Sequence, residues 1–139
     1  MPKRLSGGMK SSFAVSRGLP VGARVLCADN SGAKIAQIIA VVGYKTRLNR
    51  YASAMPGDMV VVTVKTGKVD MRHKIWRAVV VRQRKPYKRA DGTWIAFNDN
   101  AVVITDEKGN PKGSDVRGPI AREAAERWPA VAKLASIIV

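Results

Sequence analysis

Cysteine, histidine and long apolar runs are scarce in this sequence, and each shortage excludes a class of protein. Cys27 is the single cysteine and His73 the single histidine, so the chain can build neither a disulfide framework nor a Cys/His metal site. No apolar run approaches the roughly 18 residues that span a bilayer. The opening residues, MPKRLSGG, lack the apolar segment of a signal peptide. We therefore expect a cytoplasmic protein that holds no metal and no cofactor.

Acidic residues are also few, and their positions argue against catalysis. The 10 Asp and Glu are scattered, whereas a metal nuclease needs clustered carboxylates and an acid–base hydrolase needs a positioned His or paired acids. His73 has no catalytic partner near it in the sequence, and no P-loop or GxSxG motif occurs. An enzyme acting on nucleic acid is thus the disfavoured alternative, and we expect no catalytic residues.

Positive charge, by contrast, is abundant and unevenly distributed. The chain of 139 residues has 25 Lys and Arg, a net charge of +15 and a pI near 10.7, which favours nucleic acid as the partner and an anionic membrane surface second. Residues 1–90 hold 19 cations and 3 anions, whereas residues 91–139 hold 6 cations and 7 anions. We expect the first part to face a polyanion and the near-neutral last part to contact protein.

The stretch from Lys74 to Thr105 combines buried strands with a cationic hairpin. Ala78–Val81 and Ala101–Ile104 are short and β-branched, which predicts buried strands. Asp91-Gly92 predicts a two-residue hairpin turn, because both residues tolerate positive φ. No carboxylate interrupts the cations between the first strand and this turn. We therefore expect them to be unneutralised within the protein and to bind a polyanion.

Other segments predict more strands and a helical tail. Residues 24–28 and 33–42 flank a dense turn cluster and predict a hairpin, and in residues 59–66 Val60, Val62 and Val64 share one face. Gly118-Pro119 predicts a helix start, Trp128 is expected to dock that helix on the barrel, and Pro129 to begin a second short helix. The pattern predicts a mainly β fold, a small closed or nearly closed β-barrel with a short C-terminal helical region.

Three cationic segments are the candidate RNA contacts. Cations interleaved with tyrosine suit RNA, since phosphates take the charge and bases stack on rings or guanidinium planes; the alternative is a set of solvated loops. The candidates are Lys45, Arg47, Arg50, Lys65, Lys68, Arg72, Lys74, Arg82, Arg84, Lys85, Tyr87, Lys88 and Arg89.

The order of residues resembles a known family, the universal ribosomal protein fourteen of the large subunit. The resemblance is carried by Ala78-Val79-Val80-Val81, nine residues, Asp91-Gly92, four residues, Phe97, two residues, Asn100, two residues, and Val103-Ile104. Flanking blocks agree with it: Ala28-Asp29-Asn30-Ser31-Gly32-Ala33, Pro56-Gly57-Asp58 and Gly118-Pro119-Ile120-Ala121-Arg122-Glu123.

The resemblance implies a fold, a role and partners. It implies a five-stranded barrel over residues 19–117, a C-terminal helical region over 118–139 within the same compact domain, and a basic extension over 1–18 of the archaeal and eukaryotic type. It also implies a structural protein of the large subunit at the intersubunit face. Its partners would be large-subunit rRNA, small-subunit rRNA at a bridge, neighbouring ribosomal proteins and a subunit anti-association factor. Candidate protein contacts are Arg122, Glu123, Arg127 and Trp128.

Composition leaves one further alternative open. A free-standing translation factor or RNA chaperone with the same barrel would have the same charge and the same strands. Only the family resemblance argues against it. The two would differ in behaviour, because a ribosomal protein stays on the subunit whereas a factor exchanges on and off ribosomes.

Overall fold

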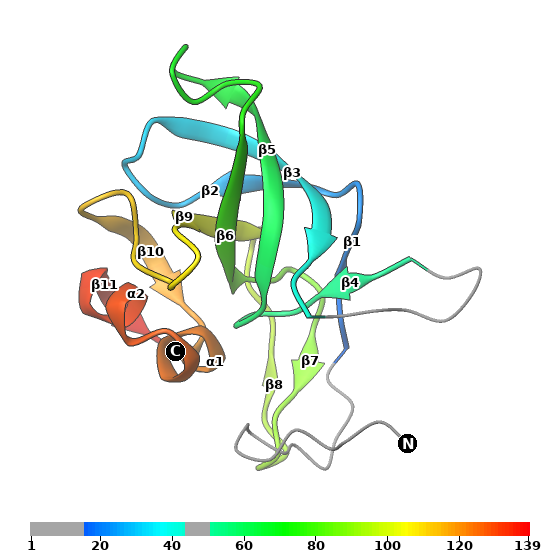
Figure 1. Cartoon of the computed structure of the whole chain (residues 1–139). Helices are drawn as coiled ribbons and strands as arrows, with labels where there is room; N and C mark the ends of the chain where they lie inside the picture. The colour runs from blue at the N-terminus through cyan, green and yellow to red at the C-terminus, as the bar shows by residue number, and fades with distance from the viewer. Residues whose placement is uncertain (1–15, 44–50) are drawn as a thin grey trace.

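A closed barrel of five strands forms the centre of the molecule (Figure 1). The computed structural model describes residues 16–43 and 51–139. Around the barrel the order is β2-β3-β5-β6-β9. The strands are β2 (Arg24–Cys27), β3 (Ala33–Val41), β5 (Met59–Gly67), β6 (Ile75–Arg82) and β9 (Ala101–Thr105). The sequence prediction of a mainly β, five-stranded barrel with a short C-terminal helical region is confirmed.

The barrel closes through a parallel strand pair. Neighbours from β2 to β3, β5, β6 and β9 pair antiparallel, and β9 then pairs parallel with β2 through Leu26↔Ala101 and Cys27↔Val102. Closure leaves no unpaired edge between these strands, which removes the hazard of edge-to-edge association.

Two apolar clusters explain the different patterns along the strands. Val60, Val62 and Val64 point into the barrel, as their alternation predicts, and all three are fully buried. In β6 and β9 the outward residues are buried as well: Val79 and Val103 pack in a second cluster that includes Val131 of the helical tail. Because the tail covers the outer face of these two strands, their sequences are continuous apolar runs and not alternating ones.

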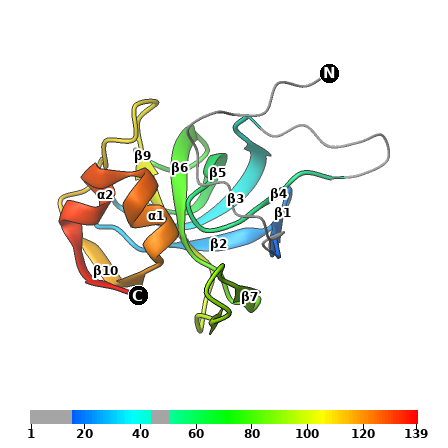
Figure 2. The same ribbon diagram turned by 90° about the horizontal axis from the view of Figure 1, so that it is seen from below.

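The helical tail covers one side of the barrel (Figure 2). It comprises α1 (Arg122–Arg127) and α2 (Pro129–Leu134). The predicted second helix beginning at Pro129 is confirmed, but the predicted helix start at Gly118-Pro119 is wrong. These residues lie in β10 (Val116–Ile120), which pairs parallel with β11 (Ala135–Ile138), a strand that the sequence did not predict.

Gly118 shows why this segment is not helical. Its φ is +75°, a backbone conformation that L side chains rarely adopt, and a Cβ there would lie 2.6 Å from Nη1 of Arg82. The glycine therefore lets β10 pass close to a buried guanidinium.

Asp29 stabilises the barrel rather than a turn alone. Its side chain is buried; Oδ2 accepts a hydrogen bond from the Ile104 amide at 3.0 Å, and Oδ1 accepts one from the Ser31 hydroxyl at 2.9 Å. Burial raises the pKa of this carboxyl, although these hydrogen bonds act in the opposite direction. The residue links the β2–β3 connection to β9.

Two short ribbons extend from the barrel. β1 (Leu19–Pro20) pairs with β4 (Ser53–Ala54), and β7 (Tyr87–Lys88) pairs with β8 (Trp94–Ile95). Within residues 16–43 and 51–139 no helix is long and apolar enough to cross a membrane, and no group of three or more Cys, His, Asp or Glu could hold a metal ion.

The β7–β8 turn differs from its predicted type. Arg89 donates its amide to Thr93 O, and Gly92 donates to Arg89 O. Gly92 has φ +92°, and Asp91 is not among the positive-φ residues of the described chain. The loop therefore has three residues, a type I turn completed by a left-handed glycine, where a two-residue turn was predicted.

We expect the thiol of Cys27 to react slowly in the folded protein. It is partly buried against the first apolar cluster, and burial, with Asp29 nearby, raises its pKa to about 12. Because the thiolate is the nucleophile, alkylation by iodoacetamide at pH 8 should be at least about tenfold slower than in 6 M guanidinium chloride. Mass spectrometry measures the rate cleanly, since the chain has one cysteine. Equal rates in both conditions would contradict the buried placement.

Candidate nucleic-acid interface

Two of the three cationic segments predicted to bind RNA lie at opposite ends of the barrel. The β5–β6 connection and the β7–β8 ribbon flank β6, which runs from Ile75 to Arg82 between them. Eight strand residues separate the two ends by roughly 23 Å. Figure 1 accordingly shows the β5–β6 connection at the top and the ribbon at the bottom. The β5–β6 connection therefore forms one cationic surface, and the β7–β8 ribbon with the residues leading into it forms a second.

At the upper end, the backbone of the β5–β6 connection is held in place by local hydrogen bonds. Lys68 donates its amide to Gly32 O at 3.0 Å, and its own carbonyl accepts the amides of Met71 and Arg72. His73 has φ 60° and donates its amide to Val64 O. The predicted contacts of this segment are all exposed: Lys65, Lys68, Arg72 and Lys74.

At the lower end, Gln83 fixes the base of the cationic ribbon. It is fully buried; its Nε2 donates to the carbonyls of Ser16 and Lys85, and its Oε1 accepts the amide of Gly18. The Arg84 amide donates to Asn100 Oδ1 at 2.7 Å. These bonds leave the side chains of Arg84, Lys85 and Lys88 exposed. This role of Gln83 was not predicted, because a glutamine within a run of cations has no distinctive sequence pattern.

Two of the predicted RNA contacts are instead neutralised by carboxylates of the same chain. Arg82 is buried, pairs with Asp99 at 2.7 Å and donates to the carbonyls of Arg117 and Pro119. Arg89 pairs with Glu123 at 2.8 Å, with 9% of its side chain exposed. The prediction that the hairpin cations are unneutralised within the protein is wrong for these two residues.

Tyr87 is also built into the protein. The residue has no exposed surface, and its hydroxyl donates to Glu123 Oε2 at 2.9 Å. Burial and the neighbouring Glu123 carboxylate raise the pKa of Tyr87 to about 12. Its ring is therefore closed to a stacking base, and it joins Arg89 and Glu123 in one polar cluster that fastens the ribbon to α1.

Trp94 is the aromatic side chain that this ribbon presents to solvent. It is 64% exposed and lies opposite Lys88 across the β7–β8 ribbon. An indole beside a lysine offers a stacking surface and a phosphate contact together. A tryptophan two residues after the turn glycine is the sequence signal that could have identified it, and it was missed.

The remaining predicted residues are three cations between β3 and β4 and the C-terminal group. Lys45, Arg47 and Arg50 lie outside the described residues. In the C-terminal group, Arg127 donates to Asp58 at 3.2 Å and Trp128 donates its indole N–H to Gly57 O at 2.8 Å. The predicted docking role of Trp128 is thus confirmed, and Arg122 stays exposed.

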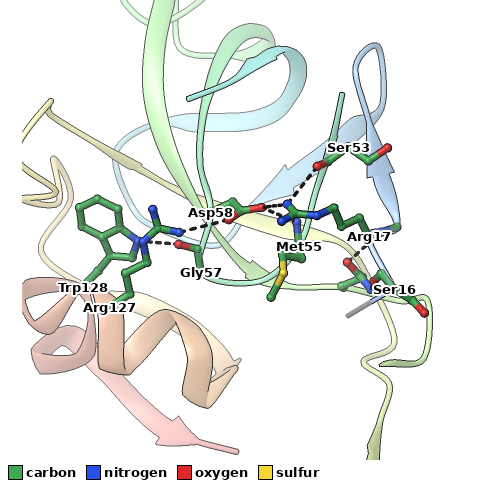
Figure 3. A network of polar contacts seen from close by, with 10 residues as sticks. Ser16, Arg17, Ser53, Met55, Gly57, Asp58, Arg127 and Trp128 are labelled. Atoms are coloured by element: carbon green, nitrogen blue, oxygen red, sulfur yellow. Dashed lines mark hydrogen bonds and ion pairs between the residues drawn. The ribbon is translucent and has the colours of Figure 1, made fainter. Parts of the chain in front are cut away.

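Asp58 links the start of the described chain to the helical tail (Figure 3). Its Oδ2 accepts hydrogen bonds from Nη1 of Arg17 at 2.7 Å and from the Met55 amide at 3.0 Å, while Oδ1 accepts one from Arg127. The segment before β1 and the end of α1 are therefore attached to the same turn before β5.

Comparisons with known proteins identify the family of this chain. The family model of ribosomal protein L14p/L23e matches residues 18–139. The chain is similar to the large ribosomal subunit protein uL14 of Pyrobaculum arsenaticum, Pyrobaculum aerophilum and Pyrobaculum islandicum, with 54% identity to each over 134 residues, covering 95% of this chain and 93% of theirs. The match over nearly the whole chain, together with the 54% identity to these relatives, shows that the chain belongs to the ribosomal protein L14p/L23e family.

Proposed function

We propose that this chain, a structural and non-enzymatic protein of the large subunit of the cytoplasmic ribosome, binds rRNA through two separate cationic surfaces. The observation that carries the proposal is unpaired positive charge at both ends of the barrel. Six exposed cations form no salt bridge with any carboxylate among residues 16–43 and 51–139: Lys65, Lys68, Arg72, Lys74, Arg84 and Lys85. Charge left unpaired in this way is stabilised by phosphates.

The separation of the two surfaces suits a protein at a junction. A single RNA helix can contact one end of the barrel, and the opposite end is then free for a second RNA segment. We infer that the two ends contact large-subunit rRNA and, at the intersubunit face, small-subunit rRNA in a bridge. The contacts would be mainly to phosphate and RNA shape, because the ribbon exposes the cations Arg84, Lys85 and Lys88 beside a single exposed aromatic ring, Trp94.

We also propose that the C-terminal region contacts protein. Residues 91–139 are near neutral, and the outer strand β11 exposes Ile137 and Ile138 by 56% and 49%. Exposed Arg122 lies beside β11, since its amide donates to Val139 O. Neighbouring ribosomal proteins and a subunit anti-association factor are the partners in this proposal. Binding of such a factor to subunits carrying Arg122→Ala tests it, and undiminished binding would exclude Arg122 from the contact.

Sedimentation of a cell lysate at low and then high salt tests the proposed location. Comigration of the protein with the large subunit through the wash is the expected result, because many contacts to phosphate and to protein would hold the chain on the subunit. Release as a small free protein would instead support a factor that exchanges on and off the ribosome.

Removing the ribbon cations should weaken RNA binding regardless of RNA sequence. For the triple replacement of Arg84, Lys85 and Lys88 by Ala, the slope of log K against log salt should fall by about 0.7 to 0.9 for each lost phosphate contact. The measurement is filter binding to purified large-subunit rRNA between about 50 and 200 mM KCl. Arg89 is left unchanged because its guanidinium pairs with Glu123.

A matched variant separates a local contact from total charge. Lys108, Arg117 and Lys133 are also exposed, and they belong to neither the β5–β6 connection nor the β7–β8 ribbon. Their triple replacement by Ala removes the same charge and should leave the slope nearly unchanged. Equal slopes for the ribbon variant and the wild type would exclude the ribbon as an rRNA contact.

A further inference from the structure

A shallow groove adjoins the base of the cationic ribbon and shares Arg84 with it. It has a volume of about 300 Å³ and lies between β2, β3 and the segment that leads into β9. Its lining residues are Arg24, Val25, Leu26, Ile35, Arg84, Asn98, Asp99 and Asn100. The sequence places these residues in three distant segments, and barrel closure brings them together through the pairing of β2 with β3 and β9.

The floor of the groove is apolar. Leu26 is 46% exposed and pairs with Ile35 across the β2–β3 ladder. Because Val25 points into the barrel, its neighbours Arg24 and Leu26 share the outer face. A flat apolar ligand can therefore lie on Leu26 and Ile35 with the Arg24 guanidinium at its edge.

The rim of the groove carries the polar groups. Arg24 and Arg84 are exposed and form no salt bridge with a carboxylate in the part of the chain that the structure describes. The one carboxylate in the groove, Asp99, is held in a two-bond pair with Arg82 at 2.7 and 3.1 Å. With that charge neutralised, the groove presents two guanidinium groups to an anion. Asn98 is exposed beside them, and an amide can both donate and accept.

We propose that this groove binds one unpaired nucleotide of an RNA strand. The apolar floor would take the base face, Asn98 would hydrogen-bond the base edge, and the guanidinium groups of Arg24 and Arg84 would hold the flanking phosphates. A duplex offers phosphates but no free base face, so it would leave Leu26 and Ile35 without a partner. The inference rests on the proposed function, since it assigns a further contact of the same RNA-binding protein. It adds Arg24 to the proposed RNA-contacting residues.

Binding of short RNA probes to the purified full chain tests the proposal. With hexauridylate in excess, the side-chain amide signal of Asn98 and the backbone signals around Arg24 should shift in a nitrogen–proton correlation spectrum. Arg24→Ala should weaken hexauridylate binding about tenfold, and Arg24→Lys should recover part of the loss, because lysine keeps the charge but not the planar fork. Lys133→Ala, a loss of one exposed cation on α2, should change binding less than twofold.

A 12-base-pair RNA duplex distinguishes a nucleotide site from a general phosphate contact. Arg24→Ala should weaken duplex binding less than twofold; equal losses for both probes would overturn the nucleotide assignment. Groove signals that respond to a hexapeptide of Asp and Glu but not to hexauridylate would assign the groove to a protein partner instead. The proposed function is judged separately by comigration with the large subunit, so either inference can fail alone.

Discussion

Val80→Asp should abolish cooperative folding of this protein. Val80 lies in the middle of β6, is fully buried in the first apolar cluster and pairs with Val102 of β9. A carboxylate there has no cation within the barrel, and burying an unpaired charge costs several kcal/mol or more. The total free energy of unfolding of a domain this size is about 5–15 kcal/mol. The substitution therefore removes most or all of the stability.

Circular dichroism during urea titration measures this effect. The wild type should show a sigmoidal transition, and the Val80→Asp variant none at 25 °C. Val69→Asp is the matched control, because the same change falls on a side chain that is 75% exposed in the β5–β6 connection, and it should shift the midpoint little. A Val80→Asp protein that unfolds with a normal midpoint would mean that water reaches the interior of the barrel.

Glu123→Ala should give the second largest loss of stability. Glu123 accepts hydrogen bonds from Arg89 and Tyr87, and the Arg89 and Glu123 side chains are 9% and 12% exposed. Removing the carboxylate leaves a nearly buried guanidinium that keeps its hydrogen bond to Val139 O at 2.7 Å but loses its Glu123 counter-charge, and a buried hydroxyl without an acceptor. Breaking one side of such a pair costs about 3–5 kcal/mol. Chemical unfolding followed by tryptophan fluorescence gives the difference in free energy directly.

Two further variants show whether the loss comes from the pair itself. Glu126→Ala changes an exposed glutamate of the same helix and should be nearly neutral. In the double variant Arg89→Met with Glu123→Leu, no charge of the pair remains buried. Its loss of unfolding free energy should therefore be smaller than the sum of the losses of Arg89→Met alone and Glu123→Leu alone. Strict additivity, or a Glu123→Ala loss below about 1 kcal/mol, would show that solvent screens this pair.

Much of the barrel could be predicted because its strands have local signals. Val60, Val62 and Val64 alternate with less buried residues, and the β-branched runs of β6 and β9 are too short for helices. The helix break at Pro129 follows from proline's missing donor. β11 could not be predicted, since Ala135–Ile138 forms a strand only by pairing with β10 after the two short helices reverse the chain.

The candidate site was predicted less well, because neutralisation acts over long distances along the chain. Counting charges from Arg82 to Arg89 finds no carboxylate, yet Glu123 lies 34 residues after Arg89 and Asp99 lies 17 residues after Arg82. Exposed Trp94 and buried Tyr87 belong to the same ribbon, so aromatic type alone did not separate a surface residue from a buried one. The fold decides which cations remain for RNA.

The parallel closure of β2 with β9 also determines how the chain folds while it is being synthesised. Leu26 and Ala101 pair across 75 residues, so loop closure comes late. β2, β3, β5 and β6 can pair in order as they emerge, but this sheet has two open edges until β9 follows. At about 5–20 residues per second, the 23 residues from Arg82 to Thr105 take roughly 1–5 s. During that interval the nascent chain exposes strand edges that other chains could pair with, a period in which a chaperone or an early RNA contact would protect it.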